Sequence, residues 1–144
     1  MLHLILLLVA FRGVYSLAAW PAGLLSDRLG REWVLVGGWI VYALVYGGFA
    51  LASSPWHLWA LYMFYGLYSG ATKGVERAFV ADLVPASAQR GAAYGTYNAV
   101  LGLAALPASV IAGVLWQTFT PAAPFMFGAA LAVLATILLV LWMR

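Results

Sequence analysis

Long apolar stretches with almost no charge are the feature that most limits what this 144-residue chain can fold into. Charge, proline and glycine divide the chain into five of them, over about residues 2–25, 33–52, 56–78, 90–116 and 122–143. A helix needs about 20 mostly apolar residues to cross the hydrocarbon core of a bilayer. The pattern therefore predicts an all-α fold, with a single domain over residues 1–144. That domain is a polytopic membrane bundle of about five transmembrane helices, surrounded by the lipid bilayer.

The composition excludes a soluble globular domain. Hydrophobic residues make up 66% of the chain and charged residues only 8%, whereas a soluble domain commonly carries charge on about a quarter of its residues. Transmembrane β-strands are disfavoured as well, because barrel strands alternate in polarity over about ten residues. None of the five stretches alternates in this way. Helices that cross a bilayer remain as the predicted architecture.

The basic residues gather on one side of the predicted bundle. Because successive helices alternate in direction, the first connection, the third connection and the C-terminus share one side of the membrane. The basic residues at that side are Arg28, Arg31, Lys73, Arg77, Arg90 and Arg144. The short loops on the other side contain no Lys or Arg. The positive-inside rule then predicts that the charged loops and the C-terminus are cytoplasmic.

Several other classes of function lack the residues they require. The basic residues are scattered and form no continuous stripe, so no nucleic-acid partner is expected. The chain has no cysteine, and its two histidines, His3 and His57, lie far apart, which makes a metal site improbable. No H-E-x-x-H pair, G-x-S-x-G elbow or phosphate-binding glycine loop is present. We therefore expect neither an enzyme nor a cofactor.

The most informative segment follows the first apolar stretch. It reads Gly23-Leu24-Leu25-Ser26-Asp27-Arg28-Leu29-Gly30-Arg31. Gly23 would let another helix approach closely, Asp27 can pair with a base or cap a helix N-terminus, and Gly30 permits a tight turn. Arg28 and Arg31 would hold the loop at the anionic lipid surface. The alternative interpretation is a plain basic loop with a turn glycine.

This segment resembles the signature loop of the major facilitator superfamily, a G-x-L-x-D-R-x-G-R-[KR] pattern between the second and third helices that recurs between the eighth and ninth. It departs from the pattern at Glu32, where the family usually has a base. A second segment, from Arg77 to Pro85 and on to Arg90-Gly91, looks like the connection between the tenth and eleventh helices. The resemblance implies that the chain is a partial six-helix C-terminal half, helices eight to twelve. Helix seven and the N-terminal half would be partners, in the same chain or a separate one, with a homodimer as a further alternative.

Five residues are candidates for contact with a small solute. Arg12 lies near the middle of the first apolar stretch, where an arginine costs about 2.5 to 3.5 kcal/mol and usually faces a bundle interior. Tyr62, Tyr65 and Ser69 recur at helical spacing on one face of the third stretch, and Asn98 lies on the fourth. The alternatives are that Arg12 extends its side chain outward to the membrane surface and that the tyrosines serve ordinary packing.

Other residues are candidates for helix packing and conformational control. Gly91 and Gly95 form a small-xxx-small pair that can pack backbone to backbone against a partner. Pro107 predicts a kink in the same helix.

At the charged side we predict ion pairs of Asp27 with Arg77 and of Arg31 with Glu76, which would lock one conformation. Each is expected to contribute about 1 kcal/mol or less, because it is half exposed. The alternative is a set of independent, solvated charges that serve topology alone.

The resemblance implies transmembrane transport of a small solute by alternating access, as part of a secondary transporter in a bacterial inner membrane. In such proteins two halves rock about a central site. The alternative is a membrane scaffold, an accessory protein or a truncated remnant that transports nothing, because 144 residues do not form both halves.

Overall fold

The computed structural model describes residues 2–84 and 89–143, with side chains from residue 5 onward. These residues form five α-helices: α1 (Leu2–Leu29), α2 (Arg31–Leu51), α3 (Pro55–Asp82), α4 (Arg90–Thr118) and α5 (Ala123–Trp142). No strand occurs in this part of the chain. The all-α bundle of five helices predicted from the apolar stretches is therefore confirmed. Two residues named in the sequence predictions, Pro85 and Arg144, lie outside the described residues.

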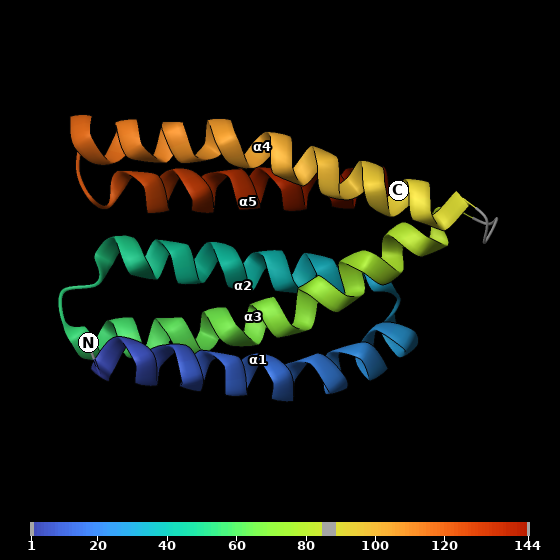
Figure 1. The fold of residues 1–144 in the computed structure, drawn as a ribbon, viewed down its shortest axis with the longest axis horizontal. Coiled ribbons are helices and arrows are strands. Elements are labelled where there is room, and N and C mark those ends of the chain that lie inside the picture. The colour runs from blue at the N-terminus through green and yellow to red at the C-terminus, as the bar shows by residue number, and fades with distance from the viewer. Residues whose placement is uncertain (1, 85–88, 144) are drawn as a thin grey trace.

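The helices alternate in direction along the bundle (Figure 1). The α1–α2 break at Gly30 and the α3–α4 connection lie at one end, which we call the charged end. The α2–α3 connection, residues 52–54, and the α4–α5 connection, residues 119–122, lie at the other, which we call the uncharged end. The arrangement brings the two charged connections together, as the alternation of helices predicts.

By length and composition, four of the five helices can cross a membrane: α1, α2, α4 and α5. The exception is α3, which corresponds to the predicted spanning stretch at residues 56–78. It is 28 residues long, but charged and hydroxyl side chains make it less apolar than the others. Four of its five buried positions are small or polar, namely Gly66, Ser69, Gly70 and Thr72, and the fifth is Val75. The helix thus turns mainly small and hydroxyl side chains toward the other helices.

Helices α1 and α3 both extend further at the charged end than expected, and α3 ends at Asp82 instead of near residue 78. α1 continues to Leu29 instead of ending near residue 25, and Ser26 Oγ donates a hydrogen bond of 2.8 Å to the Gly23 carbonyl. Gly30 then stops the helix: its φ is +92°, and its N–H donates to the Ser26 carbonyl at 3.1 Å. A glycine at this position avoids the strain that a Cβ would add at positive φ. α2 begins at the next residue, with Glu32 in its first turn.

Helices α1 and α3 pack closely through two glycines on α3. A Cβ added at Gly66 would lie 3.2 Å from the carbonyl oxygen of Phe11, and one added at Gly70 would collide with the carbonyl oxygen of Tyr15. Gly66 and Gly70 are four residues apart, the spacing that lets two membrane helices approach backbone to backbone. Among the described residues, a small-xxx-small contact therefore joins α3 to α1.

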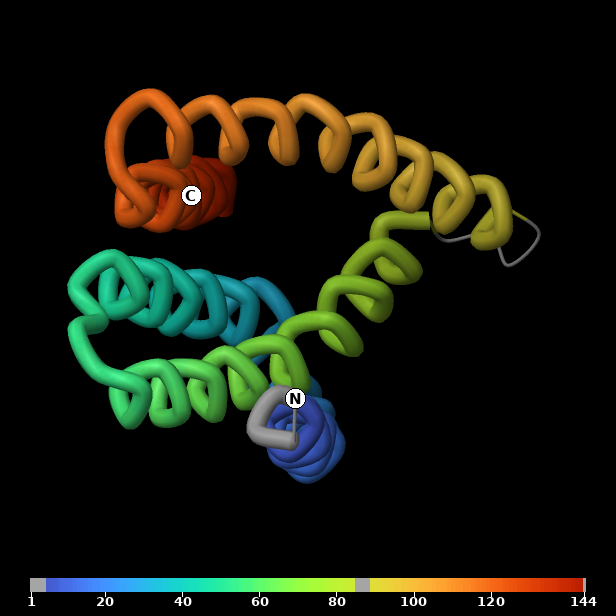
Figure 2. Tube along the Cα trace, turned by 60° about the vertical axis from the view of Figure 1, so that its left-hand side comes forward, coloured from blue at the N-terminus to red at the C-terminus, as the bar shows by residue number. Residues whose placement is uncertain are grey.

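The face of α4 that carries Gly91 and Gly95 contacts no other described helix, so its packing against a partner stays a prediction. A Cβ added at Gly91, Gly95 or Gly23 would meet no atom within 4 Å. The reason is that α4 stands at the edge of the bundle and buries none of its residues among those described. Figure 2 shows α4 as a bowed helix that continues through Pro107 and approaches α3 near one end and α5 near the other.

Candidate functional site

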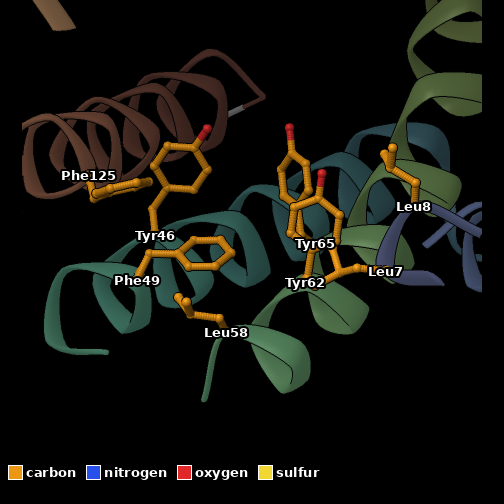
Figure 3. A pocket seen from close by; sticks show the side chains of 8 residues that line it. All are labelled: Leu7, Leu8, Tyr46, Phe49, Leu58, Tyr62, Tyr65 and Phe125. Atoms are coloured by element: carbon orange, nitrogen blue, oxygen red, sulfur yellow. The ribbon is translucent and has the colours of Figure 1, made fainter. Parts of the chain in front are cut away.

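An open cavity of about 590 Å³ lies toward the uncharged end, between four helices (Figure 3). Its walls are aromatic and aliphatic, and the lining residues are Leu7, Leu8, Tyr46, Phe49, Leu58, Tyr62, Tyr65 and Phe125. They come from α1, α2, α3 and α5. Ligand pockets typically measure about 300 to 1,000 Å³ and are mostly apolar with a few polar groups. The cavity has the size and composition of a small-molecule site.

The rings around this cavity contact one another. The Tyr62 and Tyr65 centroids are 6.2 Å apart, and Tyr65 lies at the same distance from Tyr46 across the α2–α3 interface. Tyr46 meets Phe125 of α5 edge to face at 5.8 Å. Phe11 of α1 supports the other side, 5.2 Å from Tyr62 and 5.8 Å from Tyr65. Contacts of this geometry stabilise beyond simple burial, so the cavity wall is a continuous aromatic network.

The polar groups of the cavity are three phenol hydroxyls. Figure 3 shows the hydroxyls of Tyr46, Tyr62 and Tyr65 on the same side, pointing away from Phe49 and Leu58. A phenol can donate one hydrogen bond and accept others. No Asp, Glu, Lys or Arg lines the cavity among the described residues. The site can therefore stack on a flat ligand and bind its polar atoms, but it supplies no counter-charge.

Ser69 lies one helical turn beyond Tyr65 on α3 and is only 1% exposed. Its Oγ has no hydrogen-bond partner among the described residues. The neighbouring buried hydroxyl, that of Thr72, donates to the Tyr68 carbonyl at 2.9 Å. Buried polar groups without a partner are rare and costly. Ser69 is thus an unsatisfied hydroxyl in the interior next to the aromatic network.

The five candidate contact residues are not gathered at one point. Tyr62 and Tyr65 line the cavity, and Ser69 follows them on α3. Arg12 is exposed on α1 next to Phe11, outside the cavity lining. Asn98 is exposed on α4, also outside that lining. Tyr62, Tyr65 and Ser69 thus form one group, and Arg12 and Asn98 stand apart from it.

The charged end holds a second, smaller cavity of about 510 Å³. Its lining residues are Ser26, Asp27, Gly30, Arg31, Glu32, Phe79, Asp82, Leu83 and Trp142. Arg31 Nε lies 3.0 Å from Asp82 Oδ2, with the side chains 27% and 57% exposed. An ion pair this exposed contributes about 0 to 1 kcal/mol. The contact joins the start of α2 to the last turn of α3.

The predicted pairs of Asp27 with Arg77 and of Arg31 with Glu76 do not form among the described residues. The expected end of the third helix near residue 78 left Asp82 in a loop. Because α3 continues to Asp82, that carboxylate reaches Arg31 instead. Charged residues do gather at this end, as expected, but with different partners.

Helix α4 is joined to this end of α3 by two tyrosines. Tyr97 donates a hydrogen bond to Glu76 Oε2 at 3.0 Å, and Tyr94 donates to the Arg77 carbonyl at 3.1 Å. Glu76 is therefore the partner of a phenol on α4. Both bonds join the last turns of α3 to the first turns of α4, so a movement of α4 relative to α3 would break them.

Sequence reasoning missed the contribution of α2 and α5 to the aromatic cavity. Tyr42, Tyr46 and Phe49 follow one another at spacings of four and three residues, which places them on one face of α2. Tyr42 and Tyr46 stack at 4.0 Å. This spacing is visible in the sequence and could have been recognised. Phe125 could not, because only tertiary packing places α5 beside α2.

Comparison with known proteins identifies related sequences. The family model of the Major Facilitator Superfamily matches residues 2–144. An uncharacterized MFS-type transporter of Methanocaldococcus jannaschii is 38% identical over 135 residues, which cover 94% of this chain and 33% of that protein. The class B tetracycline resistance protein of Escherichia coli is 32% identical over 122 residues, covering 85% of this chain and 30% of that protein.

A multi-drug resistance efflux pump homologue of Lactococcus lactis is 31% identical over 137 residues, covering 90% of this chain and 33% of that protein. No solved structure matches the chain. The chain spans about a third of the length of these relatives. The match over residues 2–144 and the apolar helices together establish an integral membrane protein, and the chain belongs to the major facilitator superfamily.

Proposed function

We propose that this chain takes part in moving a small solute across the membrane by alternating access, as the C-terminal part of a secondary transporter. The observation that carries the proposal is the aromatic cavity formed by α1, α2, α3 and α5. In transporters of this architecture, solute sites lie between helices and two parts of the protein rock about them. The relatives that are named for tetracycline resistance and multi-drug efflux support solute transport as the activity.

The solute contacts that we propose are Tyr62 and Tyr65 in the cavity, with Ser69 one turn beyond. Arg12 and Asn98 contribute at a later stage of the transport cycle, from faces of α1 and α4 that the described helices leave exposed. A charged or amide side chain that faces lipid permanently is costly. These two residues therefore meet either a solute path or another polar surface of the assembled transporter.

The conformational role that we propose lies at the charged end, in Gly23, Asp27, Arg28, Gly30, Arg31, Glu76 and Arg77. The exposed Arg31–Asp82 pair and the Tyr97–Glu76 hydrogen bond are weak enough to break and re-form during a cycle. Gly91 and Gly95 on α4 offer an open face for a partner helix, and Pro107 gives α4 a bend.

The partner that we propose is the N-terminal half of the superfamily architecture together with helix seven, in the same chain or a separate one. A homodimer is the alternative. The membrane is the bacterial inner membrane, with the charged end in the cytoplasm. This orientation rests on the absence of Lys and Arg from the connections at the uncharged end.

A non-transporting scaffold is the second candidate function. One observation favours it: among the residues described, α4 buries none, so a long helix face is free to hold another membrane protein. A scaffold needs that face but does not need the aromatic cavity. The two functions therefore differ in what substitutions in the cavity do.

Transport tests this difference. We would measure tetracycline accumulation in energised inverted membrane vesicles that contain the native gene product. We expect Tyr65→Ala to lower uptake about three- to tenfold, because it removes ring contacts worth about 0.5 to 1.5 kcal/mol. The matched control is Phe64→Ala, an exposed ring on the same helix, which should leave uptake unchanged. Equal losses in both variants, or uptake no greater than in vesicles lacking the protein, would favour the scaffold.

A further inference from the structure

We propose that the aromatic cavity binds an uncharged, planar aromatic solute that carries hydrogen-bond acceptors, such as ring carbonyls. The inference rests on the proposed transport function and names the chemical class of its solute. Three properties of the cavity point to this class: its lack of charge, the geometry of its rings and the common direction of its phenol hydroxyls.

The lack of charge disfavours an ion. No carboxylate or basic group lines the cavity among the described residues, so neither a cation nor an anion would find a partner of opposite charge there. A cation over a ring face gains on the order of thirtyfold in affinity. The loss of its water shell in an apolar site costs several orders of magnitude, which this gain does not offset.

A cation would also be repelled by a basic residue near the cavity wall. Leu8 lines the cavity, and Arg12 follows it by four residues, on the same side of α1. The positive charge of Arg12 raises the cost of bringing a second positive charge toward this wall. An anion would need Arg12 itself as a partner, but Arg12 does not line the cavity. A neutral solute avoids both costs.

The ring geometry favours a flat solute. Tyr65 stacks on Phe11 with an interplanar angle of 25° and a centroid distance of 5.8 Å. Tyr46 stacks on Tyr42 with an angle of 27°. Rings held by such contacts lose little further conformational freedom when a solute binds. They present flat surfaces at both sides of the α2–α3 interface. A planar aromatic solute gains offset-stacked contacts with them.

The phenol hydroxyls favour an aromatic solute over the acyl chain of a lipid as the ligand of the cavity. An acyl chain could fill an apolar groove between membrane helices. It would, however, cover the hydroxyls of Tyr46, Tyr62 and Tyr65 without offering a hydrogen-bond partner, and burial of a polar group without a partner is unfavourable. A solute with carbonyl oxygens on the hydroxyl side accepts these hydrogen bonds. The arrangement in Figure 3 therefore favours the aromatic solute.

Equilibrium binding to the purified native gene product in lipid nanodiscs tests the proposal. The probes share one bicyclic ring: 2-acetylnaphthalene is neutral, 2-naphthoate is an anion and 2-naphthyltrimethylammonium is a cation. Palmitate represents the acyl chain, and empty nanodiscs correct for partition into lipid. We expect the neutral probe to bind at least tenfold more tightly than either ion, and palmitate not to displace it.

Substitutions locate the binding. Tyr65→Ala should weaken binding of the neutral probe at least tenfold. Tyr65→Phe, which keeps the ring and removes the hydroxyl, should weaken it about threefold, and Phe64→Ala should not change it. Helix content measured by circular dichroism identifies a variant that has not folded, and Tyr65→Phe is then the deciding variant. An equal or tighter affinity for an ion, displacement by palmitate, or an unchanged affinity in Tyr65→Phe would overturn the proposal.

The outcome is separable from that of the transport experiment. Tight binding of the neutral probe, with tetracycline uptake no greater than in vesicles lacking the protein, would contradict transport and leave the ligand class intact. Tetracycline uptake above that background, with tighter binding of one of the charged probes, would support transport and overturn the ligand class.

Discussion

The two ends of the bundle are built on different physical principles. At the uncharged end, rings from four helices contact one another around a cavity without charged residues. At the charged end, single polar contacts between exposed side chains, Arg31 with Asp82 and Tyr97 with Glu76, join neighbouring helices. Ring contacts are short-ranged and depend on shape, whereas exposed ion pairs are weak and easily exchanged. In the proposed transport function, the uncharged end would hold the solute and the charged end would rearrange.

The largest expected effect concerns whether the two ends face opposite sides of the membrane. The chain has no cysteine, so Arg28→Cys, Arg90→Cys and Thr120→Cys each introduce a single label site. A membrane-impermeant maleimide added to right-side-out vesicles should modify Thr120→Cys and neither of the other two. The expected effect is all or none. Labelling of Arg28→Cys and Arg90→Cys from different sides would show that the charged end does not exist as described.

The second prediction concerns the α1–α3 contact that both ends share. Gly70→Val places a side chain against the Tyr15 carbonyl, and overpacking of this kind costs about 3 kcal/mol. We expect early thermal unfolding in detergent and loss of the monodisperse peak in size-exclusion chromatography. Gly74→Val, one turn further along α3 where a Cβ meets no atom within 4 Å, is the control. If the two variants behaved alike, close packing at Gly70 would not hold α1 to α3.

The third prediction uses the buried hydroxyl next to the aromatic network. Ser69→Ala removes an Oγ that has no partner, and an unsatisfied buried hydroxyl costs about 1 kcal/mol or more. We therefore expect the variant to unfold at a higher temperature. Thr72→Val is the contrasting variant, because Thr72 donates a hydrogen bond and its loss should lower stability. Destabilisation by Ser69→Ala would mean that Ser69 has a partner, such as water or a solute, in the membrane.

The smallest effect is expected at the charged end. A double-mutant cycle with Arg31→Ala and Asp82→Ala should give a coupling energy of about 0.5 kcal/mol, because both side chains are partly exposed. The coupling should shrink further as salt increases. Chemical denaturation in detergent at low and high salt measures it. A coupling of several kcal/mol that salt leaves unchanged would make this end a permanent brace and remove the contrast with the aromatic end.

Much of the fold could be predicted because lipid imposes a simple rule. Each helix satisfies its own backbone hydrogen bonds, so length and apolarity alone locate it. The predicted helix ends were wrong at the charged end, where α1 and α3 each extend beyond the predicted limit. Charged residues such as Asp82 suggest a loop, although they also occur in a last helical turn that emerges from the membrane. The exchange of Glu76 for Asp82 as the partner of Arg31 follows from that one error.

The candidate site was predicted in part, for a related reason. Helical spacing on α3 alone was enough to bring Tyr62, Tyr65 and Ser69 together as candidates. The small-xxx-small pattern occurs on α4, at Gly91 and Gly95, and on α3, at Gly66 and Gly70. Small residues permit close packing but do not show which helix is near. The structure shows the contact of Gly66 and Gly70 with α1, and a contact of Gly91 and Gly95 with a partner stays a prediction.

The membrane environment, the number of helices, the gathering of charge at one end and the family could all be predicted from the amino-acid sequence. These properties depend on local composition and on motifs, which any short segment carries. The folded structure was needed to show which helices touch, that Phe125 and Tyr46 share a cavity with Tyr65, and that Arg31 meets Asp82. These contacts join residues far apart in the chain. Packing between helices selects them, since lipid provides little hydrophobic preference for one helix face over another.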